Sequence, residues 1–261
     1  MALTRAEVGR LLFDEHRAGT QFHTLAAECG VIDLASAYAV QREYVALLRA
    51  ARGAASGYKI GLTSPRMQKM CNIDQPIAGV VFADRVARSG VALKTRAYGR
   101  LGVEFEIAVR LGRDLPPSGN PYDAETVGNA VDGVAAAVEV VDDRNADYKS
   151  LDVLSLIADN SWNAGAILDA FRTSWPDLAE VRGALSIDGK EVDSGHGRDV
   201  LGHPFVPLAW LANRLIADGS SLKAGDIVLT GSLVTTKFPK EPGRYRYELA
   251  GIGAVDFSVE T

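Results

Sequence analysis

The chain is organised around one run, Leu101-Gly102-Val103-Glu104-Phe105-Glu106-Ile107-Ala108-Val109. Apolar and polar side chains alternate along its middle, and alternation is the period of a β-strand. In a strand, the side chains at 103, 105 and 107 face one way, and Glu104 and Glu106 lie side by side on the other face. Adjacent carboxylates raise each other's pKa unless a cation neutralises them, and their oxygens suit a hard divalent ion such as Mg²⁺ or Mn²⁺. The run therefore predicts either a metal site or, as the alternative, an edge strand whose polar face lies in water.

A third carboxylate, Glu139, lies in the apolar run Val134-Ala135-Ala136-Ala137-Val138-Glu139-Val140-Val141. A charge inside a buried strand is costly unless it is paired or bound to a metal. No Lys or Arg lies within the run. Glu139 is therefore expected either to join Glu104 and Glu106 in a three-carboxylate cage, or to form an ion pair with a distant cation.

Composition limits the class of protein. The 261 residues carry a formal net charge of −5, with 47% hydrophobic and 23% charged residues, which is ordinary for a globular chain. An acidic chain argues against nucleic acid or an anionic membrane as the main partner, and favours a small-molecule ligand. The charged first residues predict neither a signal peptide nor a membrane span, so a cytoplasmic location is expected. Cys29 and Cys71 lack a metal-binding or disulfide-framework spacing.

The pattern of elements predicts an α+β chain with a helical segment at 1–56 and a β-rich body at 57–261. Thr4-Arg5-Ala6-Glu7 has the form of a capping box that opens a helix through about Arg17, and Asp33 can cap a second helix that ends at Gly53. Short β-like runs follow from Tyr58, with helices near 123–132, 151–158 and 207–217. No G-x-G-x-x-G or repeat is evident.

Lys59 lies in the apolar, glycine-flanked run Gly57-Tyr58-Lys59-Ile60-Gly61-Leu62-Thr63-Ser64. Burial there would lower the pKa of the ammonium enough for it to shuttle protons. The alternative is a strand lysine whose stem is buried and whose charge reaches water.

Two turn-like segments are also candidates for ligand binding. Asp159-Asn160-Ser161-Trp162-Asn163 follows an expected helix, and a loop held by Asx hydrogen bonds is its simpler interpretation. Gly231-Ser232 ends a strand with two small residues, which would let a ligand carboxylate approach backbone N–H groups, or would only form a tight turn.

Together these segments resemble the 2-oxo-pent-4-enoate hydratase and 4-oxalocrotonate decarboxylase group of the fumarylacetoacetate hydrolase superfamily. The resemblance covers nearly the whole chain, and its pieces occur in the family's order. Besides the segments already quoted, they are Asp33 with Ala37-Tyr38-Ala39-Val40-Gln41, Gly202-His203-Pro204 with Ala209-Trp210-Leu211-Ala212-Asn213, and Ala224-Gly225-Asp226.

The resemblance implies a β-roll catalytic body with N-terminal and peripheral helices, and a homo-oligomer. It implies that Glu104, Glu106 and Glu139 hold Mg²⁺ or Mn²⁺ and that Lys59 is catalytic. It also implies substrate contacts from several residues near these four. They are Leu62, Ser64, Asp159, Asn160, Asn163, Gly231 and Ser232.

The implied reaction is the addition of water to a 2-hydroxy-2,4-dienoate, or its 2-oxo tautomer, to give a 4-hydroxy-2-oxo acid, as in aromatic meta-cleavage catabolism. Decarboxylation of a 2-oxo-hexenedioate would use the same metal and enolate chemistry, so it stays an alternative. An acylpyruvate hydrolase would need a His–Glu pair, and His16 and His23 lie in no matching motif. A non-catalytic binding protein is the last alternative, and the presence of Lys59 with all three glutamates argues against it.

One departure from the family pattern concerns the substrate. Many relatives have an acidic residue in a Pro-Asp-Tyr-Gly motif, where this chain has Pro76-Ile77-Ala78-Gly79. Asp84 is the candidate to replace that acid, and a loop aspartate is the alternative.

Overall fold

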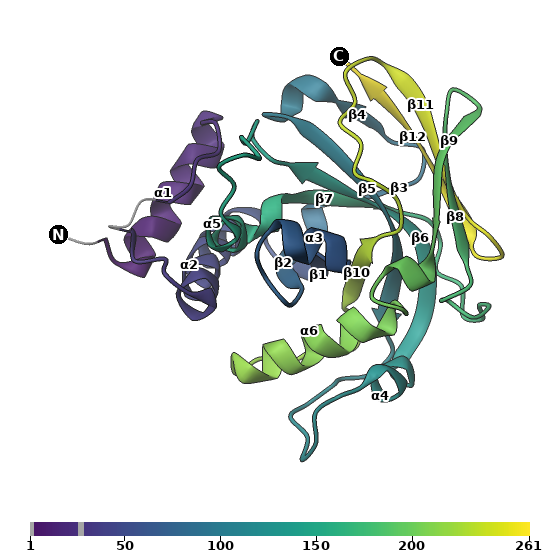
Figure 1. Cartoon of the computed structure of the whole chain (residues 1–261), viewed down its shortest axis with the longest axis horizontal. Helices are drawn as coiled ribbons and strands as arrows, with labels where there is room; N and C mark the ends of the chain where they lie inside the picture. The colour runs from purple at the N-terminus through teal and green to yellow at the C-terminus, as the bar shows by residue number, and fades with distance from the viewer. Residues whose placement is uncertain (1–2, 26–28) are drawn as a thin grey trace.

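The alternating run forms strand β5, Leu101–Leu111, at the middle of a seven-stranded sheet (Figure 1). It pairs with β6, Val131–Asp142, on one side and with β10, Ile227–Ser232, on the other. The strand prediction is therefore confirmed, and the alternative of an edge strand is wrong. The computed structural model describes residues 3–25 and 29–261.

The strand order of this first sheet is β2-β1-β10-β5-β6-β7-β3, with parallel pairs only at β1–β10 and β3–β7. The four strands not yet given are β1 Ala55–Gly61, β2 Ile77–Phe82, β3 Val86–Arg88 and β7 Asn163–Leu168. Strands β2 and β7 also contact each other, although four strands separate them in the order. The sheet is therefore curled into a roll. Small and branched apolar side chains, among them Ala108, Ala137, Ala166 and Leu229, form a separate buried cluster.

A second, five-stranded sheet of order β4-β12-β11-β8-β9 packs beside the roll (Figure 1). Its strands are β4 Ala92–Lys94, β8 Arg182–Ile187, β9 Lys190–His196, β11 Gly243–Leu249 and β12 Gly253–Glu260. Phe105 and Ile107 of β5 are fully buried in the main core, which also holds Tyr247 of β11. The apolar face of the alternating run is therefore the one that meets the core.

Two long helices, α1 Arg5–Ala18 and α2 Leu34–Arg52, pack against each other beside the roll (Figure 1). The predicted capping box at Thr4 is present, and Asp33 caps α2 as predicted. Helix α2 also contacts α5, Val153–Ala158, and strand β2. Helix α6, Phe205–Ala217, contacts β1 and β10. The division at residue 56 stays a prediction.

The sequence patterns missed or misplaced some short elements. Helix α3, Pro65–Met70, was not predicted, although Ser64 caps it and proline occupies its first turn. The helix expected over 123–132 is only α4, Ala124–Gly128, because β6 already begins at Val131. Strand β9 was missed because it is polar and at the edge of its sheet, so it carries little apolar alternation. Among the described residues, no helix is long and apolar enough to cross a membrane.

Candidate active site

Three glutamates converge on the curled sheet, on the face of β5 opposite the main core. Glu104 of β5 lies directly across from Glu139 of β6, and Glu106 follows two residues along β5 on the same face. Each offers a carboxylate oxygen, and these oxygens all lie within 4.8 Å of one another. The sequence prediction that the three carboxylates come together is confirmed.

Each glutamate is oriented by a donor from another part of the chain. The Gly231 N–H donates to Glu106 Oε2 at 2.6 Å, and the Asn163 side-chain amide donates to Glu139 Oε1 at 2.9 Å. The Thr236 hydroxyl donates to Glu104 Oε1 at 2.6 Å. The donors come from β10, β7 and the segment after β10, so the folded roll fixes the carboxylate positions before any ligand arrives.

Lys59 of β1 is the cation of this cluster, with its Nζ 3.2 Å from Glu139 Oε1 and only 4% of the residue exposed. The snorkelling alternative is therefore wrong, since the charge does not reach water. Burial lowers the pKa of Lys59, but the negative charges of Glu139, Glu104 and Glu106 outweigh burial and leave the pKa raised. The expected lowering is therefore not present, because three carboxylates surround the ammonium.

The cluster holds three carboxylates and one ammonium, so its negative charge is not fully neutralised. Burial, with the charges of Glu139 and Glu104, raises the pKa of Glu106 well above its usual range. Burial also raises the pKa of Glu139 to about 7, although Lys59 opposes the shift. Among the described residues, the buried oxygens Glu106 Oε1 and Glu139 Oε2 have no hydrogen-bond partner. Oxygen-only donors with excess negative charge and unsatisfied buried oxygens fit a hard divalent cation.

Gly231 lies at a close approach of two backbone segments that only glycine allows. Its φ is 117°, and a Cβ there would lie 1.9 Å from Thr63 Oγ1. The sequence analysis proposed that its N–H binds a ligand carboxylate. In the structure this N–H donates to Glu106. Ser232 accepts a hydrogen bond from the Phe105 N–H and donates to the Val234 carbonyl, so it ties β10 to β5. Substrate contacts from Gly231 and Ser232 stay predictions.

Leu62 and Ser64 follow β1 directly, between Lys59 and helix α3. Leu62 has a φ of 55°, and its carbonyl accepts from the Gln68 side chain at 3.0 Å. The Ser64 hydroxyl accepts from the Met67 N–H and caps α3. Both residues therefore shape the segment that leaves the cluster, and their contact with substrate stays a prediction.

Asp159 and Asn160 lie at the start of the short helix η4, Asn160–Trp162, which leads to Asn163, but their partners lie outside the glutamate cluster. Asp159 is buried and pairs with His16 Nε2 at 2.5 Å and with Arg144 Nη2 at 2.8 Å. Asn160 exchanges two hydrogen bonds with the Val80 backbone, so it braces β2. Both have structural partners that the sequence did not predict. Asn163 donates to Glu139, and substrate contacts from Asp159, Asn160 and Asn163 stay predictions.

The position of the missing acidic residue is apolar. Ile77 of β2 is buried beside Gly61, and a Cβ on Gly61 would lie 3.3 Å both from Ile77 Cγ1 and from Lys59 Nζ. Ile77 therefore forms an apolar wall close to Lys59. Asp84 is exposed in the short helix η2, Ala83–Arg85, where its carboxylate lies 3.6 Å from Arg85 Nε. That position matches the loop alternative.

Thr236 is the site residue that the sequence reasoning did not single out. It lies in the segment that follows Ser232, the last residue of β10. The sequence signal was a small hydroxyl residue close to Gly231-Ser232, the turn proposed to bind a ligand. Its contact with Glu104, 132 positions away, is seen only in the folded structure.

His16 and His23 do not join the glutamate cluster. His16 pairs with buried Asp159, and His23 Nε2 lies 2.8 Å from Glu15 Oε1 with half of the imidazole exposed. A His–Glu pair thus exists on the N-terminal helical segment, where its partner is Glu15 of α1 and none of the three converging glutamates.

Known proteins resemble the chain over nearly its full length. The family described as Fumarylacetoacetate (FAA) hydrolase C-terminal matches residues 38–260. A 2-keto-4-pentenoate hydratase of Burkholderia vietnamiensis is 32% identical, over 96% of this chain and 95% of the relative. A 2-hydroxyhexa-2,4-dienoate hydratase of Comamonas testosteroni is 31% identical, over 94% and 93% respectively. Among solved structures, 4-oxalocrotonate decarboxylase from Pseudomonas putida G7, complexed with magnesium and adipate, superposes with a TM-score of 0.90 at 25% identity and covers 99% of both chains.

Proposed function

Because the chain belongs to the fumarylacetoacetate hydrolase family, we propose that it is a carbon–oxygen lyase that adds water to a 2-hydroxy-2,4-dienoate. The product is a 4-hydroxy-2-oxo acid. The family resemblance read from the motifs is confirmed, and relatives named as hydratases extend over most of the chain. The observation that carries the proposal is the convergence of Glu104, Glu106 and Glu139 beside a buried lysine.

Glu104, Glu106 and Glu139 would hold the divalent metal, which we propose to be Mg²⁺ or Mn²⁺. Their oxygen donors, the excess negative charge and the two unsatisfied oxygens support a hard cation. When bound, such an ion supplies Lewis-acid stabilisation for charge that develops on the C2 oxygen of a 2-oxo acid.

Lys59 would move the protons of the reaction at its Nζ atom. In the first stage the C2 hydroxyl loses its proton and C5 gains one, which gives a 2-oxo-3-enoate with an electrophilic C4. In the second stage the oxygen of water bonds to C4 and a proton is added at C3. The pairing of Lys59 with Glu139 supports this role, because it holds a protonated amine beside the carboxylates. Ile77 would help to keep water away from that amine.

The remaining predicted contacts would surround the substrate at the same point of the roll. Leu62 and Ser64 lie after the Lys59 strand, and Gly231 and Ser232 end the strand that pairs with it. Asn163 would position Glu139. Asp159 and Asn160 would act indirectly, since they hold the segment that leads to Asn163.

A spectrophotometric assay with freshly generated 2-hydroxypenta-2,4-dienoate tests the proposal. We expect the dienoate absorbance to fall in the presence of Mg²⁺ or Mn²⁺, and the fall to stop when EDTA is added. The same preparation is assayed for CO₂ release from a 2-oxo-hexenedioate and for cleavage of an acylpyruvate. Faster turnover of either substrate than of the dienoate would replace the hydratase by the decarboxylase or by the hydrolase.

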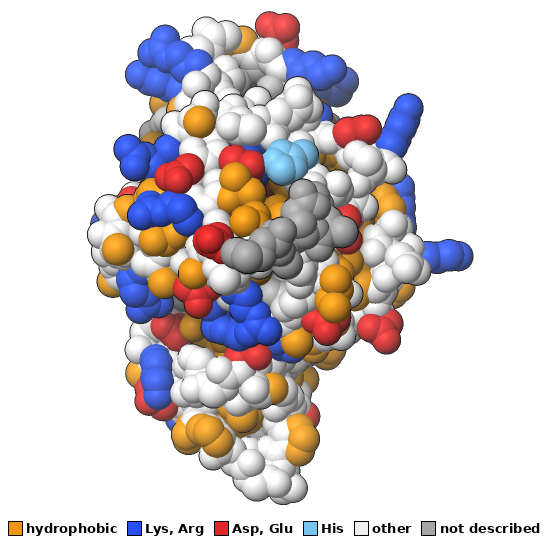
Figure 2. Space-filling view, turned by 90° about the vertical axis from the view of Figure 1, so that its left-hand side faces the viewer, with side chains coloured by type: hydrophobic (Ala, Val, Ile, Leu, Met, Phe, Trp, Pro, Cys, Tyr) orange, Lys and Arg blue, Asp and Glu red, His pale blue; other side chains and the backbone are white. Residues whose placement is uncertain are grey.

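We also propose that the protein is a cytoplasmic homo-oligomer whose interface includes the N-terminal helical region. Figure 2 shows hydrophobic side chains interspersed with charged ones over the face that carries the N-terminal helices, which is the surface that this interface would use. Light scattering at micromolar concentration should give a multiple of 27.8 kDa. A mass equal to that of one chain would reject the oligomer.

A further inference from the structure

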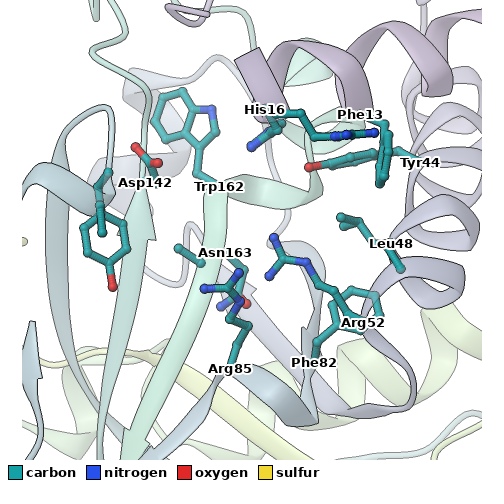
Figure 3. A pocket seen from close by; sticks show the side chains of 15 residues that line it. Phe13, His16, Tyr44, Leu48, Arg52, Phe82, Arg85, Asp142, Trp162 and Asn163 are labelled. Atoms are coloured by element: carbon teal, nitrogen blue, oxygen red, sulfur yellow. The ribbon is translucent and has the colours of Figure 1, made fainter. Parts of the chain in front are cut away.

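A cavity of about 480 Å³ lies between the N-terminal helices and the roll, apart from the glutamate cluster (Figure 3). Three arginines contribute to its wall. They are Arg17 near the end of α1, Arg52 at the end of α2 and Arg85 of η2. None of the three converging glutamates is among the lining residues.

Strand β6 contributes a residue to the glutamate cluster and another to the cavity. Glu139 belongs to the cluster, whereas Asp142, three residues further along the same strand, lines the cavity. The pairing of β6 with β5 is regular between these two residues, so side chains three positions apart face opposite ways. Asn163 lines the cavity and also donates to Glu139, so it lies between the two sites.

The charge of the cavity wall is positive. Figure 3 shows the guanidinium groups of Arg52 and Arg85 extending into the same part of the cavity. The Asp142 carboxylate is the acidic group of the described lining, and it already accepts from the backbone N–H groups of Gly99, Arg100 and Arg144. Burial lowers the pKa of Arg52, and the nearby charge of Arg85 lowers it further, although Asp84 opposes the shift.

Ordinary structural roles account for only part of this arrangement. A cation in the last turn of a helix interacts favourably with the helix dipole, and that explains Arg17 and Arg52 separately. It does not explain why Arg85, from a different element, extends toward Arg52. The Asp84 carboxylate lies 3.6 Å from Arg85, but both side chains are at least 40% exposed, so that pair is weak.

Apolar and aromatic side chains form a second part of the wall. Phe13, Tyr44, Leu48, Phe82 and Trp162 line it, and four of these five side chains carry flat rings. Guanidinium groups bind carboxylates through paired hydrogen bonds, and flat rings favour a flat ligand. The volume lies in the range of sites for small molecules rather than macromolecules.

We propose that this cavity is a second ligand site, which binds a small organic acid with a flat aromatic or conjugated body. Arg52 and Arg85 bind the carboxylate, Arg17 adds to the positive field, and the aromatic wall covers the body of the ligand. The proposal does not depend on the reaction catalysed at the glutamate cluster.

Calorimetric titration of the Mg²⁺-loaded protein with benzoate tests the site, and Trp162 in the wall provides a second signal through tryptophan fluorescence. We expect saturable binding, and an affinity lowered about tenfold or more by Arg52→Gln and by Arg85→Gln, because each loses a charge-assisted hydrogen bond. Arg113→Gln, on an exposed loop remote from the cavity lining, is the matched control and should bind benzoate like the parent.

Four further results decide between sources of binding. Absence of saturable binding would overturn the site, and so would equal affinity in the parent and both variants, because the anion would then occupy another place such as the metal. Inorganic phosphate that binds as tightly as benzoate would overturn the assignment to a flat organic acid. Binding that persists after EDTA treatment and is weakened by the two arginine variants would support it.

Discussion

Two buried groups of charges in this molecule are balanced in opposite ways. Asp159 has a fully buried carboxylate, but His16 and Arg144 both reach it, at 2.5 and 2.8 Å. Burial alone would raise the pKa of Asp159, yet these two partners leave it lowered. At the glutamate cluster, Lys59 faces three carboxylates, and the pKa values of Glu106 and Glu139 are raised.

The difference separates a structural ion pair from a ligand site. The Asp159 group joins α1 to the segment between α5 and β7, and both oxygens of the Asp159 carboxylate have partners within the chain. The negative charge of the glutamate cluster is neutralised only if a cation is added. This is expected of a ligand-binding site, and not of an ion pair that only joins two segments. Removing a charge should therefore have opposite consequences in the two places.

The largest expected effect is the loss of turnover in Lys59→Met. Deleting the ammonium should lower kcat by roughly 10²- to 10⁴-fold, the range for a lost general acid or base, while methionine keeps the length and apolar stem. Steady-state rates for water addition and decarboxylation, with circular dichroism as a check of the fold, measure this. Lys94→Met, at an exposed strand residue, is the matched control. Turnover within a few-fold of the parent would reject Lys59 as the proton carrier.

The next effect concerns the balanced group. Asp159→Asn should lower the free energy of unfolding by about 3–5 kcal/mol, because it leaves buried Arg144 undercompensated. Metal affinity should stay within a few-fold of the parent. Asp256→Asn is the matched control, since it breaks an Arg246 pair that is about half exposed and should cost less than about 1 kcal/mol. Urea titration measures both. If the Asp159→Asn protein were stable but bound metal more weakly, Asp159 would have a role in metal binding and not in stability.

A smaller effect is the pH dependence of stability without metal. Glu106 and Glu139 have raised pKa values in the folded state, so their protonated forms stabilise the fold. That contribution is fully present below the unfolded glutamate pKa of about 4.3, and it is lost as pH rises through about 7, the pKa of Glu139. The melting temperature of EDTA-treated protein should therefore fall over this window.

Asp159 makes the opposite contribution, because its pKa is lowered in the folded state. Its stabilisation is present above the unfolded aspartate pKa of about 3.9 and is lost only as pH falls through the lower folded value, so it is constant between pH 5 and 8. Melting curves with and without excess Mg²⁺ isolate the cluster. If the melting temperature depends on pH in the same way with and without Mg²⁺ across that window, the glutamates do not have the raised pKa values that we infer.

How far the sequence could predict this molecule follows from the range of each interaction. The period of two placed Glu104 and Glu106 on one face, and a lone charge in an apolar run indicated that Glu139 needs a partner. The caps at Thr4 and Asp33 were readable because their partners lie three residues away. These are local patterns, and the folded structure repeats them.

Partners distant in sequence could not be predicted in the same way. His16 and Asp159 are 143 positions apart, so the sequence predicted a substrate contact for Asp159. In the structure its partners are an imidazole and a guanidinium. Thr236 reaches Glu104 across 132 positions. The pKa of Lys59 was expected to fall because burial was foreseen, but the summed charge of three carboxylates was not weighed against burial. Strand β9 was missed because an edge strand shows little alternation.

The most direct test of the central claim, that the three glutamates form a divalent metal site, is calorimetric titration with Mg²⁺ and Mn²⁺. The parent is compared with Glu104→Gln, Glu106→Gln and Glu139→Gln, and with Glu248→Gln at an exposed position as the control. We predict that each of the three site variants binds metal about tenfold or more weakly, and that the control binds like the parent. Unchanged affinity in all three site variants would contradict the metal site.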